Sequence, residues 1–168
     1  MKTLLDHLSQ YAAYHRNPRN IATHFVGIPM IVLAVVVLLS RPALGSLGPW
    51  VLSPALFFAA AASVYYLRLD LALGLTMTLF LNLCLHVAAG IAAAGTSVWL
   101  GWGLGLFLIG WAIQFVGHYF EGKKPAFVDD IMGLMIGPLF VAAELAFLLG
   151  LRQELKLQIE SRFQTERA

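Results

Sequence analysis

Gln114-Phe-Val-Gly-His118-Tyr-Phe-Glu121 closes a long apolar run and places three polar side chains at helical spacing. Gln114 and His118 are four residues apart and His118 and Glu121 are three apart, so all three project from one face of a helix. A helix that is otherwise compatible with lipid therefore has one polar face. Because polar groups are costly in hydrocarbon, we expect this face to meet polar partners from elsewhere in the chain.

The composition around this stretch is that of a membrane protein. Of the 168 residues, 60% are hydrophobic and 12% are charged, and the mean hydropathy is +0.78. Soluble domains average roughly 45–50% apolar and about 25% charged residues. Apolar runs of about 20 residues fill the length, so residues 1–168 are predicted to form one integral-membrane domain. The single cysteine, Cys84, excludes an intramolecular disulfide, and the scattered basic residues behind the net charge of +2 give no footprint for nucleic acid.

The apolar runs predict an all-α fold, a polytopic membrane helix bundle with about four spanning helices. These helices are expected at residues 21–40, 51–67, 71–94 and 98–120. Residues 1–19 precede them, and 2–15 have the pattern of a short amphipathic helix that lies in the membrane interface. Pro18 is expected to break this helix before the first span begins.

The membrane core is predicted to cover residues 21–150, and the apolar pattern is less regular in its last segment. Residues 131–150 are apolar but are interrupted by Gly137-Pro138 and by Glu144, so they either span the bilayer or form a kinked or re-entrant segment. The tail, residues 151–168, is charged and is expected to be a helix that faces solvent.

The distribution of basic residues favours four full spans with both ends of the chain in the cytoplasm. With the N-terminus inside, ten Lys and Arg residues lie on the cytoplasmic side and only Arg41 lies outside, provided that 131–150 does not cross. If it crosses, the count becomes six to five. The favoured topology also places Asp70, at the start of the third span, on the cytoplasmic side.

Under this topology, the start of the first span and the end of the fourth lie at the same membrane face. Two groups of polar residues that are far apart in sequence are thereby brought to one level. They are His15, Asn20 and His24 in the first group and Gln114, His118 and Glu121 in the second.

A histidine and a carboxylate one helical turn apart can ligate a single metal ion, as His118 and Glu121 are here. Two histidines and one carboxylate suit non-haem iron(II), because they leave positions open for dioxygen and substrate. Zinc is the competing metal, and the spacing alone does not separate the two. A histidine at a helix end is also often only an interfacial anchor or a cap, so the case rests on the whole group.

Other polar residues receive simpler interpretations. His86 lies in the middle of the third span and is predicted to be a packed core histidine. Asp129 and Asp130 are expected to cap the following helix. Glu144 either bonds backbone groups freed by Pro138 or lines a cavity.

The two polar groups belong to longer motifs: Tyr14-His15-x-x-Pro18-x-Asn20-x-x-x-His24-x-x-Gly27-x-Pro29 and Gln114-Phe-x-Gly117-His118-x-x-Glu121-Gly-x-x-Pro125-Ala126. In these motifs the chain resembles the membrane 2-hydroxy fatty acid dioxygenases, over about residues 10–150. The resemblance implies an iron(II) enzyme of fatty acid α-oxidation, in which dioxygen cleaves the C1–C2 bond of a 2-hydroxy fatty acid and leaves a chain one carbon shorter.

The same resemblance implies the roles of the motif residues. It makes His15, His24 and His118 candidate iron ligands and Glu121 either a fourth ligand or a partner of the ligands. Asn20 and Gln114 would orient ligands or substrate. The expected partners are a 2-hydroxy fatty acid, dioxygen and membrane lipid; the oligomeric state stays open.

The protein is expected in the cytoplasmic membrane of a bacterium or in the endoplasmic reticulum membrane of a eukaryote, with its site on the cytoplasmic face. Alternative functions are a zinc-dependent membrane lipid hydrolase and a non-enzymatic small transporter or scaffold. The histidine-box hydroxylases and desaturases rank below these, because they need more histidines than the five in this chain.

Overall fold

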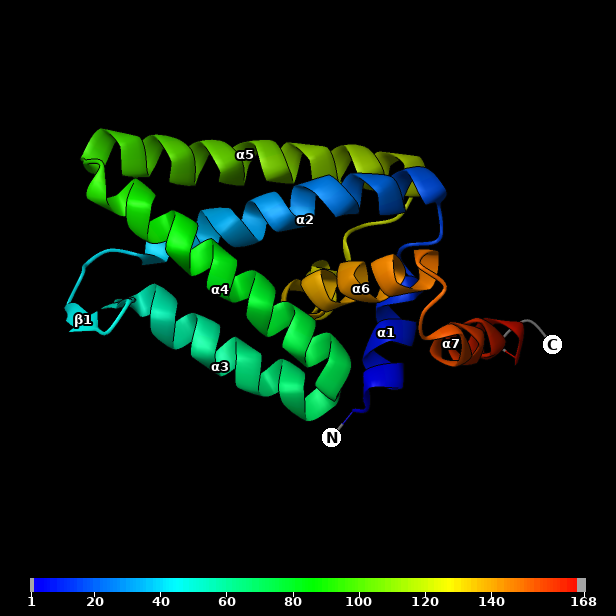
Figure 1. The fold of residues 1–168 in the computed structure, drawn as a ribbon. Helices are drawn as coiled ribbons and strands as arrows, with labels where there is room; N and C mark the ends of the chain where they lie inside the picture. The colour runs from blue at the N-terminus through cyan, green and yellow to red at the C-terminus, as the bar shows by residue number, and fades with distance from the viewer. Residues whose placement is uncertain (1, 166–168) are drawn as a thin grey trace.

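The structure, a computed structural model, describes residues 2–165 and is a bundle of helices with one short β-hairpin (Figure 1). Arg167, one of the ten Lys and Arg residues assigned to the cytoplasmic side, lies outside the described residues. The elements are α1 Leu4–Ala12, α2 Pro18–Leu39, β1 Gly45–Leu47, β2 Trp50–Leu52, α3 Pro54–Leu69, α4 Leu71–Ala93, α5 Thr96–Glu121, the 3₁₀ helix η1 Ala126–Val128, α6 Gly133–Leu148 and α7 Gln153–Thr165.

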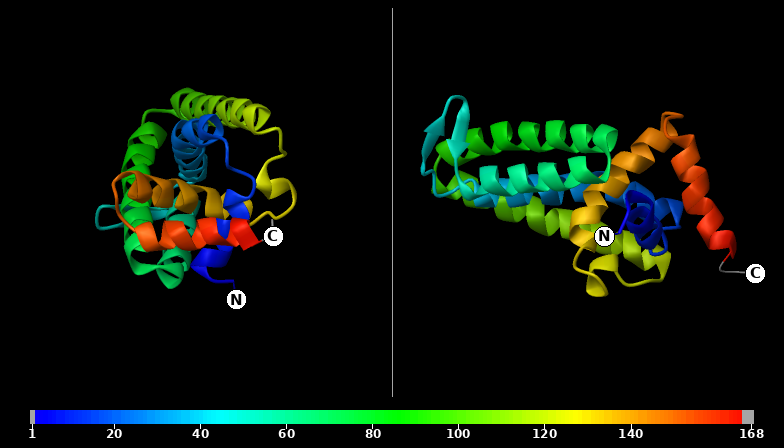
Figure 2. Two further views of the ribbon diagram at one scale, coloured as in Figure 1. Left: turned by 90° about the vertical axis from the view of Figure 1, so that its right-hand side faces the viewer. Right: turned by 90° about the horizontal axis from the view of Figure 1, so that it is seen from below.

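Helices α2, α4 and α5 are long and apolar enough to cross a membrane, in agreement with three of the predicted spans. Helix α3 has 16 residues, which is shorter than the about 20 that a straight crossing takes. The prediction that this helix starts at residue 51 was wrong, because Trp50–Leu52 pairs with Gly45–Leu47 in an antiparallel hairpin. This hairpin lies at the end of the bundle opposite α7 (Figure 2).

The segment predicted to be kinked or re-entrant is bent, but at a different place. Pro138 lies inside α6, whereas a turn of 113° separates α6 from α7. The two helices together could form one broken span or a re-entrant loop. The tail also differs from the solvent-facing helix that was expected, because Leu155 and Ile159 of α7 are buried against the core.

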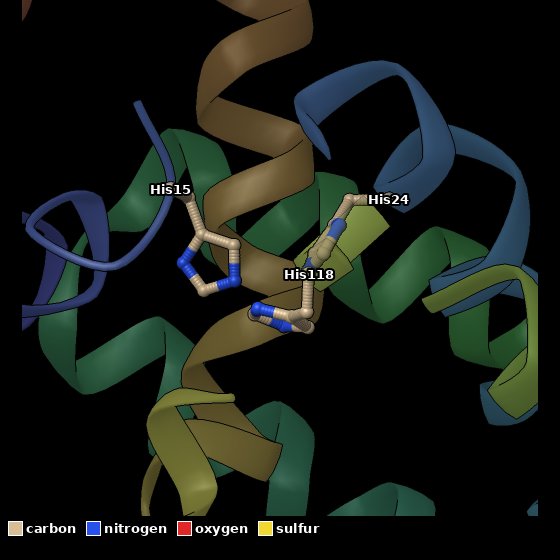
Figure 3. A group of neighbouring side chains, drawn as sticks. All are labelled: His15, His24 and His118. Carbon is tan, nitrogen blue, oxygen red and sulfur yellow. The ribbon is translucent and has the colours of Figure 1, made fainter. Parts of the chain in front are cut away.

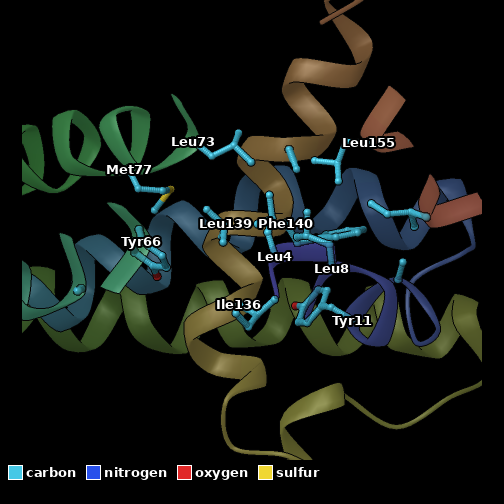
Figure 4. Close-up of a cluster of buried hydrophobic side chains, with 14 of the residues drawn as sticks. Leu4, Leu8, Tyr11, Tyr66, Leu73, Met77, Ile136, Leu139, Phe140 and Leu155 are labelled. Atoms are coloured by element: carbon cyan, nitrogen blue, oxygen red, sulfur yellow. The ribbon is translucent and has the colours of Figure 1, made fainter. Parts of the chain in front are cut away.

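Helix α1 has the amphipathic character that its sequence predicted. A capping box starts it: Thr3 accepts a hydrogen bond from the backbone N–H of Asp6, and the Asp6 carboxylate accepts one from the backbone N–H of Thr3. Its apolar face is buried in a core with α3, α4, α6 and α7, around Leu8 and Phe140 (Figure 4). This core places the C-terminal end of α1 beside α2 and α6.

Helix α2 begins at Pro18, three residues earlier than predicted. Proline is favourable at the first position of a helix, where its missing N–H is not needed. Asn17 caps the helix by accepting a hydrogen bond from the N–H of Arg19. The earlier start places Asn20 inside the first turn.

Helices α2 and α5 lie side by side along most of their length (Figure 1). Gly103, Gly110 and Gly117 recur every seven residues of α5 and face α2. A Cβ atom at Gly110 would lie 2.7 Å from Cγ1 of Ile31 and 3.1 Å from the carbonyl oxygen of Gly27. Small residues let helix backbones approach closely in membranes, and this approach positions the polar ends of the two helices.

Replacement of Gly110 tests this packing. We expect Gly110→Ala to lower the stability by roughly 1–3 kcal/mol, because the added methyl group overpacks the contact between α2 and α5. Gly101→Ala is the matched control, since nothing lies within 4 Å of a Cβ atom at Gly101. Thermal unfolding in detergent measures both, and equal midpoints for the two variants would contradict the close packing.

Candidate metal centre

Three histidines from distant parts of the chain converge at one end of the bundle (Figure 3). His15 lies in the turn between α1 and α2, His24 in α2, and His118 in the last turns of α5. Their ring centroids are 4.4 Å apart for His15 and His24, 5.0 Å for His15 and His118, and 5.3 Å for His24 and His118. One ring nitrogen from each lies within 4.8 Å of the other two, and all three side chains are buried.

The hydrogen bonds of the rings leave nitrogen atoms free to face the centre. Nδ1 of His15 donates to the carbonyl oxygen of Tyr11, and Nδ1 of His24 donates to that of Asn20, both at 2.8 Å. Metal-bound histidines commonly donate their second ring N–H to a backbone carbonyl in this way. Nε2 of His15 and Nδ1 of His118 are buried and have no hydrogen-bond partner in the described part of the chain. These free nitrogens fit a metal ion.

His15 lies outside the spanning helices, and its protonation state also suits a metal ligand. Burial lowers the pKa of its imidazole to about 4 from the ordinary 6.5. The ring is therefore neutral at physiological pH, as a ligand must be.

The carboxylate of Glu121 binds the turn that holds His15. It accepts hydrogen bonds from the backbone N–H groups of Arg16, at 3.0 and 3.1 Å, and Asn17, at 2.8 Å, and from the side-chain amide of Asn20 at 3.0 Å. Within residues 2–165, the group of possible metal ligands contains the three histidines and no carboxylate.

Two amide side chains lie buried beside the histidines, and each has a buried polar atom without a hydrogen-bond partner among the described residues. The Oδ1 atom of Asn20 and the Nε2 atom of Gln114 have no partner among the described residues. Gln114 sits against Gly27, where a Cβ atom would collide with its Nε2 atom. The structure thus brings all six predicted site residues to one end of the bundle.

A cavity of about 70 Å³ opens beside the cluster. Its polar lining comes from Tyr11, His24, Gln114 and His118. The rest of the lining is apolar and comes from α2, α5, α6 and the η1 segment, with Ile31, Trp111 and Leu134 among its members. The ring of Trp111 packs edge-on against Phe127 at 5.0 Å, which ties α5 to the η1 segment.

Comparisons with a family model and with a curated relative point to the same family. A family model described as "2-hydroxy-palmitic acid dioxygenase Mpo1-like" matches residues 1–149. The chain belongs to this family. The 2-hydroxy-palmitic acid dioxygenase MPO1 of Saccharomyces cerevisiae is 34% identical over 165 residues, which covers 94% of this chain and 89% of the yeast protein. No solved structure matches the chain.

Family membership confirms the resemblance that the two motifs indicated. The histidines of both motifs are those of the buried cluster, so this dioxygenase-family chain has a three-histidine group that could hold a metal ion.

Some polar residues lie away from the three-histidine cluster. His86 was predicted to be a packed core residue, and this was wrong: it is exposed, packs edge-on against Trp50 at 4.9 Å and lines a second cavity of about 420 Å³ by the hairpin. Asp70 caps α4 through the N–H of Leu73 and pairs with Arg152 at 2.7 Å.

The remaining acidic residues have separate surroundings. Asp129 and Asp130 were expected to cap α6, and this was wrong, because the N-cap of α6 is Met132 and no side chain caps this helix. Asp130 accepts a hydrogen bond from the N–H of Met132 in the turn before the helix, and Asp129 binds the hydroxyl group of Tyr14 and the ammonium group of Lys124. Glu144 is half-buried, and its carboxylate makes no hydrogen bond to the described residues.

Tyr11 is a residue of the site that the sequence did not reveal. Its ring stacks parallel on that of His15, with centroids 4.1 Å apart and planes 5° apart. Burial raises the pKa of its phenol above the ordinary value, so the hydroxyl group stays protonated. The signal in the sequence was the interval of four residues between Tyr11 and His15, which places two side chains on one face of a helix but does not by itself indicate a site.

Metal analysis tests the cluster directly. We expect the purified protein to retain one transition-metal ion per chain after dialysis, and His24→Ala or His118→Ala to lose it, because two imidazoles hold such ions far more weakly than three. His86→Ala is the matched control and should retain the metal. Mass spectrometry of the metal content measures this, and retention in all three variants would contradict the assignment.

Proposed function

We propose that the protein is an iron(II)-dependent dioxygenase that cleaves the C1–C2 bond of 2-hydroxy fatty acids. The observation that carries the proposal is the buried group of three imidazoles with ring nitrogens within 4.8 Å of one another. The family description and the name of the yeast relative support the substrate class and the use of dioxygen.

The proposed reaction balances with dioxygen as the sole oxidant. C1 leaves as carbon dioxide with both of its original oxygen atoms. C2 keeps its hydroxyl oxygen, gains one atom of dioxygen and becomes the carboxyl carbon of an acid one carbon shorter. The second atom of dioxygen leaves as water with the two hydrogen atoms that the substrate loses.

His15, His24 and His118 would hold the iron, which supplies electron transfer to dioxygen when it is bound. Zinc has no redox chemistry and does not serve a dioxygenase. The donor set consists of neutral imidazoles, which suit iron(II) and leave its charge available to attract a carboxylate.

The cavity fits an amphiphilic substrate whose head enters while its chain remains outside. At about 70 Å³ it takes a carboxylate and a hydroxyl group but not a long alkyl chain. Ile31, Trp111 and Leu134 provide an apolar path from the cluster toward the surface of helices that are compatible with lipid. An acid of this kind would therefore keep its chain in the bilayer.

The supporting polar residues have distinct proposed roles. Asn20 fixes His24 through its carbonyl oxygen and Glu121 through its amide group. Glu121 holds the turn of His15 rather than the metal itself. Gln114 offers its free Nε2 atom to the substrate. The site would face the cytoplasm, because Arg16, Arg19, Lys123 and Lys124 lie near the same helix ends.

Oxygen uptake and product analysis test the reaction. Iron-loaded protein should consume oxygen with 2-hydroxypalmitic acid and release a fatty acid one carbon shorter. Substrate labelled with carbon-13 at C1 should release labelled carbon dioxide. Zinc-loaded protein should be inactive; full activity with zinc, or no uptake by iron-loaded protein, would refute the proposal.

Replacement of Glu121 separates a ligand from a residue that supports a ligand. We expect Glu121→Gln to weaken metal binding by about 10- to 100-fold, because the N–H groups of Arg16 and Asn17 lose a charged acceptor. At saturating metal the variant should still bind one ion per chain. Glu144→Gln is the control with unchanged affinity. Complete loss of binding in Glu121→Gln, as in the histidine variants, would make the carboxylate a ligand.

A further inference from the structure

The hydroxyl group of Tyr11 lies in the wall of the cavity beside the three histidines. A Cβ atom at Gly137 would lie 2.9 Å from this hydroxyl oxygen and 3.1 Å from Cδ1 of Ile28, and both Gly137 and Ile28 line the cavity. Figure 4 shows Tyr11 next to α6, on which Gly137 lies. The absence of a side chain at Gly137 leaves room for the hydroxyl group.

This hydroxyl group is a donor without an acceptor. The side chain of Tyr11 is 7% exposed, yet the hydroxyl makes no hydrogen bond to any residue that the structure describes. The backbone carbonyl of Tyr11, by contrast, accepts from His15, and its ring stacks on the same imidazole. The hydroxyl oxygen is not among the fully enclosed polar atoms that lack a partner, so it keeps accessible surface although the residue is buried as a whole. Because Tyr11 lines the cavity, a molecule bound there can accept the hydrogen bond of this hydroxyl group.

The cavity offers hydrogen-bond donors to an acceptor group. Its free donors are the hydroxyl group of Tyr11 and the Nε2 atom of Gln114. The cations of the neighbouring loop are engaged elsewhere: Lys123 donates to the carbonyl oxygen of Ala13, and Lys124 pairs with Asp129. A carboxylate is a stronger acceptor than an alcohol, because hydrogen bonds to charged groups are the stronger kind.

We propose that Tyr11 is a substrate-binding residue whose hydroxyl group donates a hydrogen bond to the carboxylate of the 2-hydroxy acid. This inference rests on the proposed function and adds to it the group that recognises the acid. It gives Tyr11 two separable tasks. The ring and the backbone carbonyl hold His15, and the hydroxyl group selects a carboxylate.

Binding measured without turnover separates these tasks. The ligands are 2-hydroxypalmitic acid and hexadecane-1,2-diol, which share chain length and the C2 hydroxyl group and differ in the carboxylate. With zinc-loaded protein in detergent, we expect Tyr11→Phe to raise the Kd for the acid about ten-fold or more and to leave the Kd for the diol unchanged. The metal content should stay at the wild-type value, because the ring still stacks on His15.

Two further variants complete the test. Gly137→Ala keeps the phenol but displaces its hydroxyl group, so it should show the same loss for the acid alone. Tyr66→Phe removes a buried hydroxyl group that bonds the carbonyl oxygen of Met135, and it should leave the ratio of the two Kd values unchanged.

An unchanged Kd for the acid in Tyr11→Phe overturns the inference, and so does an equal weakening of acid and diol. Failure of the proposed function has a different signature. Iron-loaded wild-type protein would then bind the acid without consuming oxygen, and the effect of Tyr11→Phe on the ratio of the Kd values would still decide the role of the hydroxyl group.

Discussion

The carboxylate of Glu121 binds the backbone N–H groups of Arg16 and Asn17, and the arrangement of the site depends on this contact. A negative charge at the C-terminal end of α5 is unfavourable by itself, because the helix dipole is negative there. The start of α2 lies alongside and offers unpaired N–H groups and the positive end of its own dipole. The hydrogen bonds of this carboxylate thus connect the end of α5 to the start of the antiparallel helix α2 and hold His15 next to His118.

The glycines of α5 hold α5 close to α2 along the rest of the helix pair. In hydrocarbon there is little hydrophobic driving force between helices, so close packing of backbones takes its place. Gly110 and Gly117 bring α5 against Gly27 and Thr23 of α2. His24 and His118 project from this close contact, whereas His15 arrives from outside it on the turn that Glu121 holds. Rigid helices therefore carry two of the three imidazoles.

The sequence predicted the convergence of the polar residues because it depends only on where the spans begin and end. It did not reveal the contact of Glu121 with the turn between α1 and α2, since the spacing of Glu121 from His118 fits a metal ligand as well as a residue that binds a turn. The prediction for His86 was wrong because the sequence shows only how deep a residue lies in a span. When a span is apolar on all sides, the sequence does not show which way a side chain faces. The hairpin at Gly45–Leu52 was missed because its strands have only three residues each.

The origin of the three histidines also bears on biosynthesis. His15 and His24 leave the ribosome early, on the first turn and the first long helix, whereas His118 lies at the very end of α5. The nascent chain cannot complete the centre until α5 has been synthesised and has packed against α2. The three-histidine cluster therefore forms only after α5 has been made, and a chain that stalls before α5 contains only His15 and His24 of this cluster.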